Sequence, residues 1–169
     1  MLKKFSCFIP LILILSLNAL ATETGDTAPD VSLPDHQVGG AVVQQSILTR
    51  NKPGQFVFLD FFSTTCSACV GEMSTFSKLA KEISGTTTVR QIGLDRQENL
   101  LLGWLQDYSN DITFSVAFDS KRTATRAYGI EYTPTHILVD ANNRVIMKLV
   151  DSLSDDTVAQ IKQLVGVTE

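Results

Sequence analysis

In the middle of the chain, the apolar residues change from a continuous run to helical spacing. Residues 56–62 read FVFLDFF, a nearly unbroken apolar run typical of a strand buried on both faces of a parallel sheet. Beyond residue 66, apolar side chains recur at intervals of three and four until Ser84-Gly85 gives a stop signal. The pattern therefore predicts a central strand followed by an amphipathic helix that begins at or near residue 66.

The remaining pattern alternates between strands and helices. In chain order it predicts a strand, a helix, a strand, a short helix and two strands, over residues 87–94, 98–108, 115–118, 123–128, 135–139 and 145–150. A last helix is capped at Ser154. Strand-helix alternation predicts parallel pairing, and the turn composition of residues 140–143 suits an antiparallel hairpin. We therefore expect an α/β fold whose central mixed sheet combines parallel strands with a C-terminal antiparallel hairpin and is flanked by helices.

The N-terminal part of the chain is organised differently. Residues 1–21 combine two lysines, an apolar stretch and a small-x-small sequence, which indicates a secretory signal peptide cleaved after Ala21. The apolar stretch is shorter than the roughly 20 residues of a membrane-spanning helix, although an uncleaved N-terminal anchor is the alternative. We interpret residues 22–54 as a loop-rich extension with a short hairpin, and residues 55–169 as the α/β domain.

The composition suits one soluble domain. The chain has 169 residues, 44% of them hydrophobic, and a formal net charge of −4. Lysine and arginine do not cluster beyond residues 3 and 4, so we expect no nucleic-acid partner.

Two cysteines remain once the signal peptide is removed. Cys66 and Cys69 form a C-x-x-C pair, which could be half a zinc site, part of an iron-sulfur site or a redox centre. A bridge between them closes a very short loop and gives little stabilisation, which favours a chemical role. The amino end of a helix would stabilise a thiolate at Cys66, so we predict Cys66 as the nucleophile and Cys69 as the resolving thiol.

Two carboxylates are candidates to accept the proton of Cys69. Glu72 follows Cys69 by three residues and shares its helix face, although an exposed helix glutamate would have the same spacing. Asp60 interrupts the apolar strand, where it either faces outward or needs a partner. Both are predicted site residues.

The runs Asp60-Phe61-Phe62, Cys66-x-x-Cys69 and Thr133-Pro134 together resemble the thioredoxin fold, and more closely its secreted TlpA/ResA-like branch. The resemblance covers roughly residues 25–165. Supporting segments are Gly25-Asp26-Thr27-Ala28-Pro29-Asp30-Val31, Cys69-Val70-Gly71-Glu72-Met73, Ile112-Thr113-Phe114 and Ala127-Tyr128-Gly129-Ile130.

The resemblance implies roles for several residues. Pro134 would be a cis proline facing the disulfide, and Thr133 would offer backbone groups to an extended substrate segment. Glu72 matches the active-site glutamate of the family, and Asp60 matches the buried aspartate of cytosolic thioredoxins. Thr65 stands where tryptophan is usual, and Ser67-Ala68 replaces a pair that often contains proline, so the redox direction stays open.

We therefore expect a periplasmic or otherwise extracytoplasmic thiol-disulfide oxidoreductase that reduces protein disulfides. We expect a monomer that needs no cofactor beyond the Cys66–Cys69 disulfide. Its partners would be disulfide-containing substrate proteins and a membrane thiol transporter as electron donor. The alternatives are an oxidase or isomerase of DsbA or DsbC type, and a copper or zinc carrier that uses Cys66, Cys69 and His136.

Overall fold

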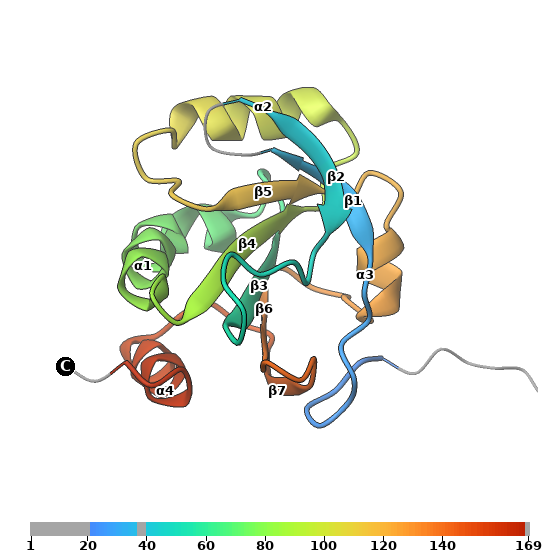
Figure 1. Ribbon diagram of the computed structural model, residues 1–169. Helices are drawn as coiled ribbons and strands as arrows, with labels where there is room; N and C mark the ends of the chain where they lie inside the picture. Colours follow the sequence, from blue (N-terminus) through green and yellow to red (C-terminus); the bar gives the residue numbers. More distant parts are fainter. Residues whose placement is uncertain (1–20, 37–39, 168–169) are drawn as a thin grey trace, which may run out of the picture.

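The computed structural model describes residues 21–36 and 40–167, so the predicted signal peptide lies outside the described residues except for Ala21. A single seven-stranded sheet, in the order β2-β1-β5-β4-β3-β6-β7, runs through the centre of the molecule (Figure 1). Its strands are β1 (Ser32–His36), β2 (Val42–Ser46), β3 (Phe56–Phe62), β4 (Thr87–Gly93), β5 (Ser115–Phe118), β6 (Thr135–Val139) and β7 (Val145–Leu149). The helices are α1 (Ser67–Ile83), α2 (Glu98–Asp107), α3 (Thr123–Ala127) and α4 (Asp155–Leu164).

The strand directions confirm the predicted mixed sheet. β3, β4 and β5 pair in parallel, whereas β6 is antiparallel to both β3 and β7. Apolar side chains of α1, α2 and α4 join one core cluster, and α3 contributes to the cluster on the other face. No helix in the part of the chain that the structure describes is long and apolar enough to cross a membrane.

Side-chain alternation along β3 and β6 decides which residues can meet beneath α1. Phe58 and Phe62 of β3 belong to the cluster that contains α1, whereas Val57, Leu59 and Phe61 belong to the opposite one. Asp60 is in phase with the first set, because successive side chains of a strand point to opposite faces. His136 of β6 is in phase with Leu138, which lies in the same cluster as α1. Asp60 and His136 are also direct partners in the strand register.

The short hairpin expected in the N-terminal extension is present as β1 and β2, and it continues the main sheet. Among the described residues, β1 pairs with β5 at Asp35–Ala117 and His36–Val116. A buried ion pair strengthens the junction, because Arg90 Nε of β4 lies 2.8 Å from Asp35 Oδ2 of β1. Arg90 Nη1 also donates to the backbone oxygens of Ser46 and Ile47.

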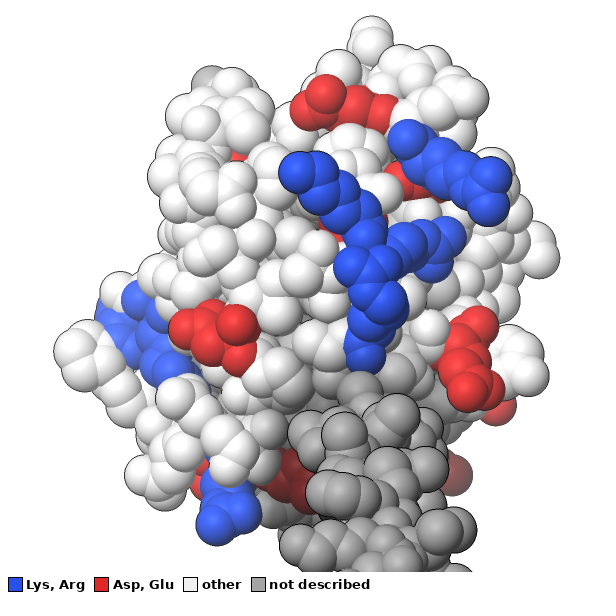
Figure 2. All heavy atoms as spheres, turned by 90° about the vertical axis from the view of Figure 1, so that its right-hand side faces the viewer, with Lys and Arg blue, Asp and Glu red and all other residues white. Residues whose placement is uncertain are grey.

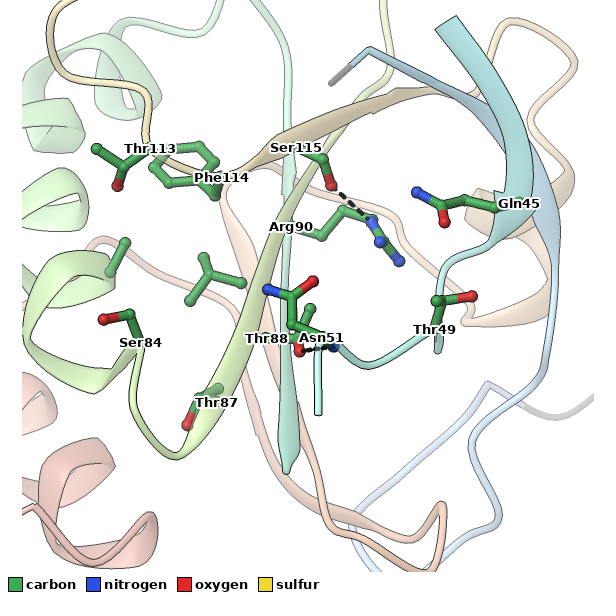
Figure 3. A pocket seen from close by; sticks show the side chains of 12 residues that line it. Gln45, Thr49, Asn51, Ser84, Thr87, Thr88, Arg90, Thr113, Phe114 and Ser115 are labelled. Carbon is green, nitrogen blue, oxygen red and sulfur yellow. Dashed lines mark hydrogen bonds between the residues drawn. The ribbon is translucent and has the colours of Figure 1, made fainter. Parts of the chain in front are cut away.

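Arg90 lines a polar hollow of about 230 Å³ at the amino end of β4 (Figure 3). Its side chain points toward Ser115, whose Oγ accepts a hydrogen bond from Arg90 Nε at 2.9 Å. Thr88 Oγ1 accepts from the backbone nitrogen of Asn51 on the same side of the hollow. These contacts give Arg90, in the middle of β4, a structural role on the opposite sheet face from Asp60.

Candidate active site

The two cysteines lie at the junction of β3 and α1, as the sequence predicts. Cys66 is the N-cap of α1 and is bonded to Cys69 in a disulfide. The backbone nitrogen of Cys69 donates to Cys66 Sγ at 3.2 Å, so an amide of the first helical turn points at that sulfur. Cys66 is partly exposed, whereas Cys69 is only 3% exposed. Only the first thiol is therefore open to a partner.

Asp95 holds the turn that leads into Cys66. Its Oδ1 accepts hydrogen bonds from Ser63 Oγ and Thr64 Oγ1, both at 2.9 Å, and the Thr64 amide also donates to this carboxylate. Asp95 follows β4, whose end is paired with the end of β3 at Phe62 and Gly93. Asp95 was not among the predicted site residues. An acidic residue just beyond a parallel neighbour of β3 is the signal that could have indicated it.

The Thr133-Pro134 segment faces Cys66. The peptide bond between these residues is cis, as the resemblance implies. The backbone oxygen of Thr133 lies 3.5 Å from Cys66 Sγ, and Thr135 Oγ1 donates to the Tyr132 oxygen at 2.7 Å. The segment thus presents its backbone directly beside the more exposed sulfur.

Two hollows lie beside segments that adjoin the disulfide, although neither cysteine lines them. One of about 320 Å³ is lined by Thr64, Val70, Leu100 and Trp104 among others. The second, of about 200 Å³, includes Arg122 and Thr133 in its lining.

Tyr132 also lines the second hollow and is 68% exposed. Arg122 immediately precedes α3. Figure 2 shows basic and acidic side chains interspersed on the side of the molecule where Figure 1 places α3. Glu131 lines the same hollow as Arg122, so the surface beside Thr133 carries charges of both signs next to apolar side chains.

Asp60, Glu72 and His136 form a buried cluster behind the cysteines. His136 Nδ1 lies 3.3 Å from Asp60 Oδ1, and His136 Nε2 lies 3.4 Å from Glu72 Oε1. The exposed fractions are 1% for Asp60, 7% for Glu72 and 0% for His136. Neither predicted carboxylate is thus an outward-facing surface residue, and the structure adds a histidine between them.

The outer oxygens of both carboxylates have fixed donors. Gln91 Nε2 donates to Asp60 Oδ2, and the backbone nitrogen of Leu153 donates to Glu72 Oε2, both at 2.8 Å. Asp60 Oδ1 and the two ring nitrogens of His136 have no hydrogen bond of regular geometry among the described residues. The open positions of the cluster therefore face one another.

Burial and mutual charge shift the pKa values within this cluster. Burial raises the pKa of Asp60 to about 6, against the opposing effects of His136 and of the Gln91 hydrogen bond. Burial alone would lower the pKa of His136. The contact with Glu72, the charge of Asp60 and the charge of Glu72 outweigh burial and raise that pKa, with help from the backbone of Asp151.

The metal-carrier alternative requires Cys66, Cys69 and His136 to converge. Among the described residues, the close cluster of His, Cys, Asp and Glu donor atoms consists of Asp60, Glu72 and His136, all within 4.8 Å of one another. Neither cysteine belongs to it. The structure thus gathers the predicted carboxylates with His136, and gathers the cysteines separately with Thr133 and Pro134.

Comparisons with known proteins agree with this site. A model of the AhpC/TSA family matches residues 24–148. The chain is 28% identical to the thiol-disulfide oxidoreductase ResA of Oceanobacillus iheyensis, over 72% of this chain and 62% of that protein. It is 30% identical to the thiol:disulfide interchange protein DsbE of Vibrio cholerae, over 70% of this chain and 60% of that protein. The chain thus spans about three fifths of the length of these two relatives.

A solved structure is similar along nearly its whole length. The candidate thiol:disulfide interchange protein DsbE of Chlorobium tepidum is 29% identical, with a TM-score of 0.69 over 87% of this chain and 99% of that one. A 2-Cys peroxiredoxin of Plasmodium vivax, at 16% identity and a TM-score of 0.70, shares the fold. The expected thioredoxin-like fold and the resemblance to ResA-type thiol-disulfide oxidoreductases are confirmed.

Proposed function

The chain belongs to the AhpC/TSA family, and on that premise we propose that it is an extracytoplasmic thiol-disulfide oxidoreductase that reduces disulfides of other proteins through Cys66 and Cys69. One observation carries this proposal. Cys66 Sγ sits at the amino end of α1, partly exposed and 3.5 Å from the Thr133 oxygen, while Cys69 is buried beside it. One thiol can therefore meet a substrate while the other can reach only Cys66.

The reaction follows from this asymmetry. In the reduced protein the Cys66 thiolate attacks a substrate disulfide, a mixed disulfide forms, and the first substrate sulfur leaves as a thiolate. Cys69 loses its proton and attacks Cys66 Sγ, which forms the Cys66–Cys69 bond and releases the second substrate sulfur. Two electrons pass from the dithiol to the substrate disulfide, and two protons end on the substrate thiols.

Amides at the start of α1 favour the first thiolate. The Cys69 amide donates to Cys66 Sγ, and the positive end of the helix dipole adds to its effect. Cys69 has no such setting, so its proton needs an acceptor. Asp60 and Glu72 are the candidate acceptors, because both are buried carboxylates on the face of the sheet that α1 covers.

The substrate chain would lie across Thr133 and Pro134. The backbone of Thr133 adjoins Cys66, and the two hollows provide room for side chains on either side of the substrate cysteine. Backbone pairing with an extended segment is tolerant of sequence. This arrangement suits a dithiol that accepts more than one protein disulfide.

Reduction in an oxidising compartment needs an outside source of electrons. A membrane thiol transporter would supply them, and no cofactor beyond the dithiol is required. Thr22 Oγ1 donates to the Ala127 oxygen, and Lys148 Nζ donates to the Thr22 oxygen, so the residue that would become the mature amino terminus is tied to the domain. Mass analysis of the mature amino terminus tests cleavage after Ala21, and an intact amino terminus would favour the anchor.

Separate serine variants of the cysteines test the mechanism. Reduction of insulin by dithiothreitol should be accelerated by the native protein and return to the uncatalysed rate with Cys66→Ser. Cys69→Ser should instead accumulate a mixed disulfide on Cys66, which can be isolated with its partner. Full activity of Cys66→Ser would reject the mechanism. Stoichiometric copper or zinc in a protein that lacks reductase activity would favour the carrier.

Redox equilibration decides the direction. A potential near the roughly −270 mV of thioredoxin supports a reductant, whereas a value near the roughly −120 mV of strong oxidants supports an oxidase or isomerase. Thr65 and Ser67-Ala68 can be exchanged individually to locate the residues that set this value. Size-exclusion chromatography with light scattering tests the expected monomer.

A further inference from the structure

We propose that His136 joins Asp60 and Glu72 into one proton-holding unit, so that the acceptor of the Cys69 proton is the three-residue cluster and neither carboxylate alone. This inference rests on the proposed function for its link to Cys69. The histidine is a positioning residue in this scheme, because it acts on Cys69 through the carboxylates.

The topology brings the three groups together from separate elements. Asp60 and His136 are register partners on β3 and β6, and Glu72 lies on α1 one turn after Cys69. The two ring nitrogens of His136 face different carboxylates, at 3.3 Å from Asp60 Oδ1 and 3.4 Å from Glu72 Oε1. The imidazole therefore bridges two acids that approach it from opposite sides of the ring.

Only some protonation states of the Asp60–His136–Glu72 cluster are favourable. A neutral imidazole has one N–H and one bare nitrogen, and a bare nitrogen facing an ionised oxygen is repulsive. The favourable states hold two protons: an imidazolium between two carboxylates, or a neutral imidazole beside one carboxylate and one carboxylic acid. Both states have a net charge of −1, and moving one proton along one N···O contact interconverts them.

The surroundings keep this exchange inside the cluster. The donors Gln91 and Leu153 occupy the outer oxygens of Asp60 and Glu72, which leaves Oδ1 and Oε1 facing the ring. Phe58 and Phe76 stack on His136 with centroid distances of 5.8 and 6.3 Å. These phenyl rings fix the imidazole plane, and the full burial of His136 keeps its nitrogens away from solvent.

The other described neighbours of His136 that make or oppose its contacts are neutral groups. β4 contributes the neutral Gln91, β7 places Leu149 opposite His136, and the segment before α4 contributes the backbone of Asp151. The raised pKa of Asp60, about 6, agrees with a proton held within the cluster near neutral pH.

A shared proton site suits the resolving step. When Cys69 gives up its proton, the cluster passes from a net charge of −1 to neutral, and a buried group is less costly when neutral. The Cys69 thiolate then attacks Cys66 Sγ, the bond between Cys66 and the substrate sulfur breaks, and its electron pair leaves with the substrate. The released thiolate takes up a proton from solvent, and the cluster returns one proton to solvent.

Nitrogen-15 NMR of His136 in the reduced protein tests the bridge without relying on turnover. Glu72→Gln should leave a neutral ring with its N–H on Nδ1, facing Asp60. Asp60→Asn should move the N–H to Nε2, facing Glu72. His36, which is buried and lies 3.5 Å from Glu98, is the internal control whose signals should stay unchanged. A His136 tautomer that neither substitution alters would overturn the proposal.

A double-mutant cycle then tests the link to Cys69. In a Cys66→Ser background, the pH dependence of Cys69 alkylation is measured for Asp60→Asn, Glu72→Gln and the combination. We expect a coupling of more than about one pKa unit, as for strongly interacting sites, and its loss when His136→Leu is added. His36→Leu is the matched control. Additive shifts with His136 present would overturn the proposal, as would stoichiometric zinc in the purified protein.

The two tests separate the cluster from the activity. Coupled His136 tautomers in a protein without disulfide reductase activity would support the bridge and overturn only the proposed function. Active reductase with uncoupled tautomers would overturn the bridge alone.

Discussion

The backbone oxygen of Thr133 lies 3.5 Å from the Sγ of Cys66, so the cis-proline segment and the more exposed sulfur form one surface. Under the proposed function, a substrate segment that pairs with the Thr133 backbone would present its cysteine to Cys66. Tyr132, which precedes this segment and is 68% exposed, is the large side chain that such a substrate would cover first.

Tyr132→Ala should weaken the binding of protein substrates. Aromatic side chains at the centre of an interface commonly contribute more than 1 kcal/mol, so we expect KM for a protein disulfide to rise about tenfold, or about 1.4 kcal/mol. Reduction of hydroxyethyl disulfide should be unchanged, because that substrate is too small to reach Tyr132. The control is Val42→Ala, a substitution at an exposed residue of β2. Equal losses with both substrates would contradict a docking role.

Asp95→Ala should destabilise the turn before the cysteines. The substitution leaves donors on Ser63 and Thr64 without their acceptor, at a cost of about 1–3 kcal/mol. Urea unfolding should show this loss, and alkylation of reduced Cys66 should change in rate because its turn is no longer held. The exposed Asp111→Ala is the matched control. An unaltered urea midpoint for Asp95→Ala would show that the turn holds without this carboxylate.

Asp60→Asn should change how stability depends on pH. Because the folded pKa of Asp60 is raised from 3.8 to about 6, the unfolded chain ionises first as pH rises through this window. The free energy of unfolding should therefore fall across it, by up to about 3 kcal/mol for a shift of about two units.

Asparagine cannot ionise, so the free energy of unfolding of Asp60→Asn should not fall between pH 3.8 and about 6. The pKa of His136 is raised above its ordinary value of 6.5 in the folded protein, so protonation of His136 stabilises the fold. This stabilisation is complete below pH 6.5 and is lost as the pH rises through the pKa of the folded state. The contribution of Asp60 changes between pH 3.8 and about 6, and that of His136 changes above pH 6.5, so the two can be measured separately. Urea titrations at pH 4, 6 and 8 measure them, and parallel curves for the native protein and Asp60→Asn between pH 4 and 6 would refute the assignment.

Asp35→Asn should loosen the N-terminal hairpin from the sheet. It leaves the buried Arg90 charge without its partner, and breaking a buried ion pair costs about 3–5 kcal/mol. The double variant Asp35→Leu with Arg90→Met should regain much of that loss, because no charge is left unpaired. The mostly exposed Glu23→Gln should change stability by no more than about 0.5 kcal/mol. A double variant as unstable as Asp35→Asn would argue against this account.

The local pattern of apolar and turn residues was sufficient to predict much of this structure. The apolar run of β3 and the helical spacing after Cys66 placed the dithiol at a strand-helix junction, and the turn residues after β6 indicated the C-terminal hairpin. These features depend on neighbours along the chain, so the sequence carries them directly.

What the sequence could not supply depends on contacts between distant segments. The partnership of Asp60 with His136 requires the register of β3 against β6, and the junction of β1 with β5 depends on strand pairing and the Arg90–Asp35 contact. His136 was expected to act only in a metal-carrier alternative, because nothing nearby in the chain indicates that its nitrogens face two acids. Asp95 was missed for the same reason.

If the cluster holds the Cys69 proton as proposed, the register of β6 against β3 makes the chemistry of Cys69 a reporter of correct folding. Side chains on a strand alternate between faces, so a slip of a single residue would turn His136 away from α1 and put Thr135 or Ile137 in its place. A misassembled molecule could still close the Cys66–Cys69 disulfide while lacking the imidazole beneath it. Thiol titration could thus distinguish native from misfolded chains that a simple count of disulfides would score as identical.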